Sequence, residues 1–214
     1  MFNKLKTLFS AAEKIHSQSQ TSASKPDGSD ATREVERLSR SAQQFEEEAD
    51  WRSAADLYER IAKLEPENIR WIKDLAFVLS EDEAWDESIA VYEQVLALLP
   101  EDANAHCNIG RMRLQQDELE AAESHLQTAL RIAPEHTHAL FYQGMLCQRN
   151  KQFQESLVYF ESSIRSEPSF HFALHNIAVS HIALGDTKAA SEALCRCKDI
   201  LHDGGLNLPL VMPP

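Results

Sequence analysis

The chain has 214 residues and a formal net charge of −13, from 21 basic and 34 acidic side chains. This length suits one domain or one repeat array, and six glycines with eight prolines leave little room for a turn-rich β-fold. The excess of acid disfavours nucleic acid as a partner, because phosphate neutralisation needs a basic surface, and favours a basic or neutral polypeptide.

The first segment, residues 1–16, is predicted to form a short basic amphipathic helix. Apolar residues recur there at helical spacing, with lysines between them. Three uses stay open: an unattached tail, a contact with a membrane surface, or docking onto the acidic repeats or a partner. The apolar run is too short and too polar for a secretory signal, so we expect a cytoplasmic protein, with peripheral membrane contact through residues 2–15 left open.

Residues 17–33 are rich in Ser, Gln, Thr, Asp and Pro, which predicts a flexible linker. The charge is uneven along the chain. Residues 1–33 carry five basic and three acidic side chains, whereas residues 69–102 carry two basic and nine acidic ones. Residues 137–170 carry three of each, so we expect the repeats to be strongly acidic at one end and nearly neutral at the other.

An internal repeat begins after the linker and occupies residues 34–204. Pro66, Pro100, Pro134 and Pro168 lie 34 residues apart, with no insertion between them. Because a proline cannot continue a helix, each one predicts the end of a helix just before it. The repeats, numbered 1 to 5 below, are 35–68, 69–102, 103–136, 137–170 and 171–204.

Two positions of every repeat hold only alanine, glycine or serine, and a third position holds a large side chain. Two antiparallel helices can cross closely only where both side chains are small, so this pattern predicts a helical hairpin in each repeat. Position 8 holds Ala42, Ala76, Gly110, Gly144 and Ala178; position 20 holds Ala54, Ser88, Ala122, Ser156 and Ala190; position 24 holds Tyr58, Tyr92, Leu126, Phe160 and Leu194.

With this period and these positions, residues 35–202 resemble the tetratricopeptide repeat (TPR) family. The resemblance implies an all-α fold, an α-solenoid of helix-turn-helix repeats forming a right-handed superhelix, in which each repeat is stabilised by its neighbours. It also implies a protein that binds other proteins and is not an enzyme. Repeat 5 departs from the pattern, with His202 in place of the proline and Thr187 where the second helix usually opens on a bulky residue.

The resemblance further implies that the first helix of each repeat lines a concave groove, through positions 2, 5, 6 and 9. Asparagines at position 6 clamp a bound peptide backbone in similar proteins, since an amide both donates and accepts hydrogen bonds. In the alternative that we keep open, Phe141 or Phe172 turns inward to fill a gap. The predicted peptide-binding residues are Lys73, Phe77, Asn104, Asn108, Arg111, His138, Phe141, Tyr142, Met145, Phe172, His175, Asn176 and Val179.

The C-terminal residues 205–214 are predicted to form an extended, apolar tail after a helix that ends at Gly204 and Gly205. No solvating helix follows the last repeat, as TPR arrays usually have. We therefore expect the tail to fold back over repeat 5, or that face to form a contact between copies of the chain in a homo-oligomer.

No residue pattern predicts catalysis, a metal site or a cofactor. The four cysteines are expected to be reduced thiols, because the chain is too long and too poor in cysteine for a disulfide framework. His171 and His175 share a helical face, but no H-E-x-x-H motif or carboxylate with clear ligand spacing accompanies them. There is also no Gly-rich phosphate loop.

The sequence thus predicts a protein-interaction scaffold or adaptor that binds a polypeptide segment in the groove. A first alternative is a TPR-type chaperone for secreted proteins. The stretch from Phe170 to His175 loosely resembles the third repeat of such chaperones, although they have three repeats and this chain has about five. A second alternative is a self-assembling or membrane-peripheral scaffold that uses residues 2–15.

Overall fold

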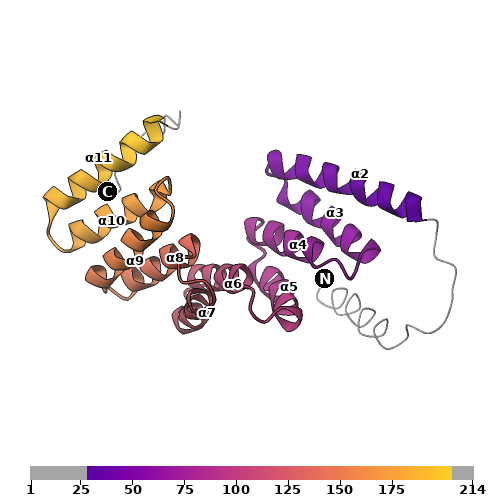
Figure 1. The fold of residues 1–214 in the computed structure, drawn as a ribbon, viewed down its shortest axis with the longest axis horizontal. Helices are drawn as coiled ribbons and strands as arrows, with labels where there is room; N and C mark the ends of the chain where they lie inside the picture. The colour runs from indigo at the N-terminus through magenta and orange to yellow at the C-terminus, as the bar shows by residue number, and fades with distance from the viewer. Residues whose placement is uncertain (1–27, 204–214) are drawn as a thin grey trace. The chain divides into compact units, whose positions relative to one another are not determined.

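The computed structural model describes residues 28–203, and over that range every regular element is a helix. The all-α fold is thereby confirmed (Figure 1). The predictions for residues 1–16 and 205–214 lie outside the described residues. The helices are α2 (Gly28–Glu47), α3 (Trp51–Leu64), α4 (Ile69–Glu81), α5 (Trp85–Leu98), α6 (Ala103–Gln115), α7 (Leu119–Ile132), α8 (Thr137–Arg149), α9 (Phe153–Ser166), α10 (His171–Ala183) and α11 (Thr187–Asp203).

The helices described by the structure form five hairpins, each with a first helix (A) and a second helix (B). The chain divides into an N-terminal unit that ends at Pro100 and a C-terminal unit that begins at Glu101. In the N-terminal unit α2, α3, α4 and α5 pack in succession. In the C-terminal unit α6 to α11 also pack in succession, and A helices contact each other, α6 with α8 and α8 with α10.

The first helix starts earlier than the sequence predicted. The linker expected over residues 17–33 overlaps α2, which begins at Gly28. The polar residues of this stretch are compatible with the first turns of a helix, where Asp30 lies close to Arg33, at 3.4 Å. Val35 and Leu38 are 5% and 2% exposed, so packing of the next turns against the unit holds α2 in place.

All ten small residues at positions 8 and 20 are buried, as the pattern requires. The helices approach each other closely at the two glycines. A Cβ atom on Gly110 would lie 2.7 Å from Leu126 Cγ, and one on Gly144 would lie 2.6 Å from Phe160 Cε1. Leu126 and Phe160 are fully buried, so the large side chain at position 24 fills the space that position 8 leaves open.

The turn inside each hairpin repeats with the same period. The residue at position 15 has a positive φ in every repeat: Ala49, Glu83, Asp117, Lys151 and Gly185. The next N–H then donates to the carbonyl five residues back, as from Asp50 to Phe45 at 2.8 Å. This is a Schellman motif, which satisfies carbonyls at the end of the A helix, and only repeat 5 uses the glycine that suits it best.

The prolines end the B helices as predicted. Helices α3, α5, α7 and α9 each end two residues before a proline of the repeat. In repeat 5, where His202 replaces the proline, α11 continues to Asp203. The fixed φ and missing N–H of proline therefore account for the ends of four B helices, and the absence of this proline from repeat 5 accounts for the longer fifth B helix.

Candidate protein-interaction surface

The predicted groove residues of the C-terminal unit lie on α6, α8 and α10, and they differ widely in exposure. Asn104, His138, Phe172 and His175 are exposed. Asn108, Arg111, Tyr142, Met145, Asn176 and Val179 are half-buried. The A helices of this unit therefore present a mixed surface of amides, histidines and aromatic rings.

An aromatic cluster joins α8 to the start of α10. The ring of Phe170 lies 5.1 Å from His138, 5.2 Å from Phe141 and 5.6 Å from Phe172, between ring centroids and with edge-on geometry in each case. Phe170 is 9% exposed, whereas Phe172 is 56% exposed. Phe170 thus anchors the cluster, and Phe172 leaves an apolar ring open to solvent beside it.

Phe141 is not available to a ligand in the way the sequence predicted. It is 9% exposed and packs into the core of the C-terminal unit, with its ring 5.7 Å from Phe160. Its neighbour Tyr142 is half-buried against the same core. Phe141 therefore takes the inward alternative and Phe172 does not, because the space beside Phe160 in the core is filled by the Phe141 ring.

Hydrogen bonds hold two of the predicted asparagines. The Asn176 Nδ2 donates to the main-chain carbonyl of Phe172 at 3.0 Å, and the Gln148 Nε2 donates to the main-chain carbonyl of Asn176 at 2.8 Å. Asn104 Oδ1 lies 3.0 Å from His136 Nε2. These bonds set the orientation of the amides and leave Asn176 Oδ1 and its second N–H as groups that could meet a peptide backbone.

Histidines of the C-terminal unit are close to one another. His106 Nδ1 and His125 Nδ1 are 3.1 Å apart across α6 and α7. Burial first, and then the neighbouring His106 and Arg113, lower the pKa of His125. Burial also lowers the pKa of His136, with His138 adding to the effect. Both side chains therefore favour the neutral form in the folded chain.

The two predicted residues of the N-terminal unit lie on α4. Phe77 is 42% exposed and Lys73 is half-buried. Asp74 lies beside them, and its burial raises the pKa of that carboxyl despite the nearby Arg70. This surface is charged and has one open ring, in contrast to the aromatic cluster of the C-terminal unit.

The sequence pattern missed Phe170 and Gln148. Phe170 occupies the last position of repeat 4, outside the positions taken to face the groove, although the alternation of rings from Phe170 to Phe172 could have indicated it. Gln148 Nε2 also reaches Ser180 Oγ at 2.7 Å. Both residues connect α8 to α10 and position the side chains of the surface.

The thiols differ in accessibility. Cys107 is buried, and burial raises its pKa to about 12. Burial raises the pKa of Cys147 to about 11 and also raises that of Cys197. Cys195 is exposed. Over residues 28–203, no three histidine, cysteine or acidic side chains come together as metal ligands would.

None of the helices between residues 28 and 203 has the length and apolar character needed to span a membrane. A repeated helical hairpin with small residues at the crossing defines a helical-repeat protein. Three tetratricopeptide-repeat family models match residues 68–135, 113–169 and 173–200. The chain belongs to the tetratricopeptide-repeat family, and its fold is that of a protein-interaction scaffold, a class that is typically non-enzymatic.

Solved TPR structures share this fold at low sequence identity. A thermophilic TPR protein of Thermus thermophilus is 15% identical, with a TM-score of 0.68 over 81% of this chain and 93% of that one. MamA from Desulfovibrio magneticus is 15% identical, with a TM-score of 0.64 over 79% and 96%. YrrB, described as a TPR protein with an unusual peptide-binding site, is 19% identical, with a TM-score of 0.56 over 82% and 98%. None of the curated proteins compared with this chain matches it.

Proposed function

We propose that the chain is an adaptor whose helices α6, α8 and α10 hold an extended segment of another protein. The observation that carries this proposal is the open Phe172 ring, 56% exposed beside the buried ring of Phe170. An apolar ring left open on a face with amides and histidines around it is typical of a binding surface. The peptide-binding site in the description of YrrB supports the same function by analogy of fold.

The energetics set what the partner must supply. Burying two apolar side chains against Phe172 and the half-buried Tyr142 and Met145 would contribute about 3–6 kcal/mol. Association costs about 4–15 kcal/mol in lost freedom. Apolar contact alone is therefore too weak, and backbone hydrogen bonds to amides such as Asn176 must add to it.

The partner's chemistry follows from the charges of this face. Helices α6, α8 and α10 hold no acidic side chain, and two of their three arginines, Arg113 and Arg149, pair with Glu118 and Asp117, so no strong charge is required of the ligand there. Amides on both sides of the rings favour a main chain that is extended and not already hydrogen-bonded within itself. The expected ligand is an extended segment with two apolar side chains.

Affinity purification from the native cell, with mass spectrometry, tests this function. We expect Phe172→Ala to lose a co-purified partner that the unchanged chain retains, because the ring is the main apolar contact. Val158→Ala is the matched control, since Val158 is 60% exposed on the B helix α9. Equal recovery of every partner by both variants would exclude the A-helix face.

Two results would favour the alternative functions instead. A partner that is insoluble alone and secreted would indicate the chaperone. A molar mass from light scattering that rises with protein concentration, and that is lower for Phe172→Ala, would indicate that the same face binds another copy of this chain. An adaptor of the kind proposed here stays at one mass across concentrations.

A further inference from the structure

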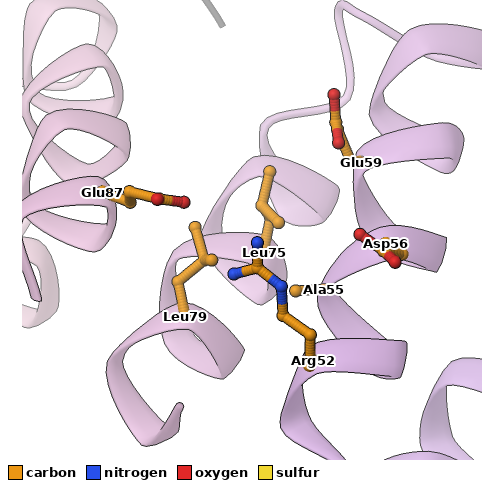
Figure 2. Close-up of a pocket in the computed structure, with 7 residues that line it drawn as sticks. All are labelled: Arg52, Ala55, Asp56, Glu59, Leu75, Leu79 and Glu87. Carbon is orange, nitrogen blue, oxygen red and sulfur yellow. The ribbon is translucent and has the colours of Figure 1, made fainter. Parts of the chain in front are cut away.

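The N-terminal unit contains a notch on the side of α4 that faces away from Lys73 and Phe77. Leu75 and Leu79 form its floor, and they lie about half a helical turn around α4 from those two residues. Figure 2 shows the carboxylates of Asp56 and Glu59 on α3 and of Glu87 on α5 around this floor, together with Arg52. The notch is therefore distinct from the A-helix face of the proposed function.

One carboxylate oxygen in the notch lacks a hydrogen-bond partner within the described residues. Glu87 Oε2 is buried, and it has no hydrogen bond within the described part of the chain. Arg52 binds Asp82, at 3.5 Å, and Lys63 binds Glu59, at 2.7 Å. A buried carboxylate oxygen without a donor is costly, so the notch favours a cation from outside residues 28–203.

The chemistry of the notch suits the ammonium group and methylene stem of a lysine side chain. Leu75 and Leu79 are each 4% exposed, so the floor offers a narrow apolar strip and no broad hydrophobic patch. Lysine lays its methylene stem along such a strip and places its ammonium group against the carboxylates at the end. An apolar helix face, by contrast, would find little surface to cover.

The corresponding notch of the C-terminal unit lacks this feature. Four of its lining residues on α9, α10 and α11 occupy the same repeat positions. They are Glu161, Ile177, His181 and Ala189, in place of Glu59, Leu75, Leu79 and Glu87. Ala189 supplies no carboxylate where Glu87 stands. Arg165 and Arg196 also line it and balance the charges of Glu161 and Glu192.

We propose that the chain's own N-terminal segment, residues 2–15, docks a lysine into the notch of Asp56, Glu59 and Glu87. The segment carries Lys4, Lys6 and Lys14 against a single acid, Glu13, whereas residues 69–102 carry a net charge of −7. The opposite charges lie in one chain, so the local concentration of the segment is high.

The connection is long enough for this contact. Residues 16–27 can span about 40 Å when extended, and about 20 Å as a flexible coil. Helices α2 and α3 are consecutive and pack against each other, and Glu34 on α2 pairs with Arg60 on α3 at 3.6 Å. The N-terminal part of α2 therefore lies beside the C-terminal part of α3, which carries Glu59. The proposed contact thus has the segment approach from the end of the notch that Glu59 occupies.

Zero-length carbodiimide cross-linking of the full chain, with mass spectrometry, tests the proposal, because it joins an amine to a carboxylate only when they touch. We expect an amide link from a lysine of residues 2–15 to Glu87 or Asp56. The isosteric variant Glu87→Gln should lower the yield of the link to Asp56 about tenfold, because a charge-assisted bond is lost. Glu161→Gln, in the notch of the C-terminal unit, is the matched control and should leave the yield unchanged.

Mixing ¹⁴N- and ¹⁵N-labelled chains, and adding vesicles with and without anionic lipid, separates the other occupants. Links within one isotope support docking within the chain, whereas mixed-isotope links assign the notch to a second copy and overturn it. The proposal also fails if the chain gives no such link, or gives equal links to Glu161 and Glu192. If the chain floats with anionic vesicles only when its N-terminal lysines are present, and gives no cross-link to the notch when vesicles are absent, the segment binds a membrane instead.

Discussion

The helix crossing at Gly144 in the C-terminal unit gives a quantitative prediction. An alanine Cβ there would lie 2.6 Å from Phe160 Cε1, 2.8 Å from Cδ1 and 2.9 Å from Cζ. The Phe160 ring is fully buried and packs against Phe141, so it cannot move away freely. Such overpacking costs about 1–3 kcal/mol, and the better helix propensity of alanine offsets up to about 1 kcal/mol.

We therefore expect Gly144→Ala to lower the free energy of unfolding by about 1–2 kcal/mol. Phe160→Ala should lower it by about 3–5 kcal/mol, because it leaves a cavity in the core. In the Phe160→Ala background the obstacle is gone, so Gly144→Ala should raise the free energy of unfolding by about 0.5–1 kcal/mol. The effect of one methyl group thus changes sign with its neighbour.

Urea denaturation followed by circular dichroism, on the unchanged chain and the three variants, measures this cycle. Alanine is tolerated at the same position opposite Tyr58 in repeat 1 and opposite Leu194 in repeat 5, so the cost belongs to the Phe160 ring and not to position 8 itself. If Gly144→Ala lowered stability equally in both backgrounds, the close crossing would not be the reason for the glycine.

Three further predictions concern turns, protonation and thiols. Lys151→Gly should raise the free energy of unfolding in urea titrations and Gly185→Ala should lower it, each by about 1 kcal/mol. Both positions have a positive φ, which only glycine adopts without strain. Nothing lies within 4 Å of a Cβ at Gly185, so a clash cannot explain the loss there. Because folding lowers the pKa of His125, the unfolded chain binds more protons than the folded chain, so stability should fall as the pH drops from about 7 to about 5. His125→Gln should make this pH dependence weaker in urea titrations. An unchanged pH dependence in His125→Gln would contradict this cause. A thiol reagent should modify exposed Cys195 within the native chain long before buried Cys107, and equal rates would contradict the packing of α6.

The repeat architecture could be predicted from the sequence because it depends on side-chain volume at fixed spacing. Ala42 and Gly144 share nothing but small size, and both are buried at a helix crossing. The four helix ends before proline follow from local backbone geometry, so they too could be predicted.

The direction of individual side chains and the start of the first helix could not be predicted in the same way. Phe141 and Phe172 occupy groove positions of successive repeats, yet one ring is buried and the other open, because Phe141 packs against Phe160 in the core and Phe172 contacts only the rings at its edge, Phe170 and His171. Likewise, Gly28 starts a helix in a polar stretch because Val35 and Leu38 pack further along it. Both outcomes depend on tertiary contacts that a repeat pattern does not specify.

The site residues that the sequence placed on the A helices remain predictions of ligand contact, and one measurement tests them most directly. A short peptide selected from a display library for binding to the chain is titrated into ¹⁵N-labelled protein, and amide shifts are mapped by NMR. The account predicts that the largest shifts fall on α8 and α10, around Phe172 and Asn176, and that Phe172→Ala abolishes them. Shifts centred on the B helices α9 and α11, with binding unchanged in Phe172→Ala, would contradict it.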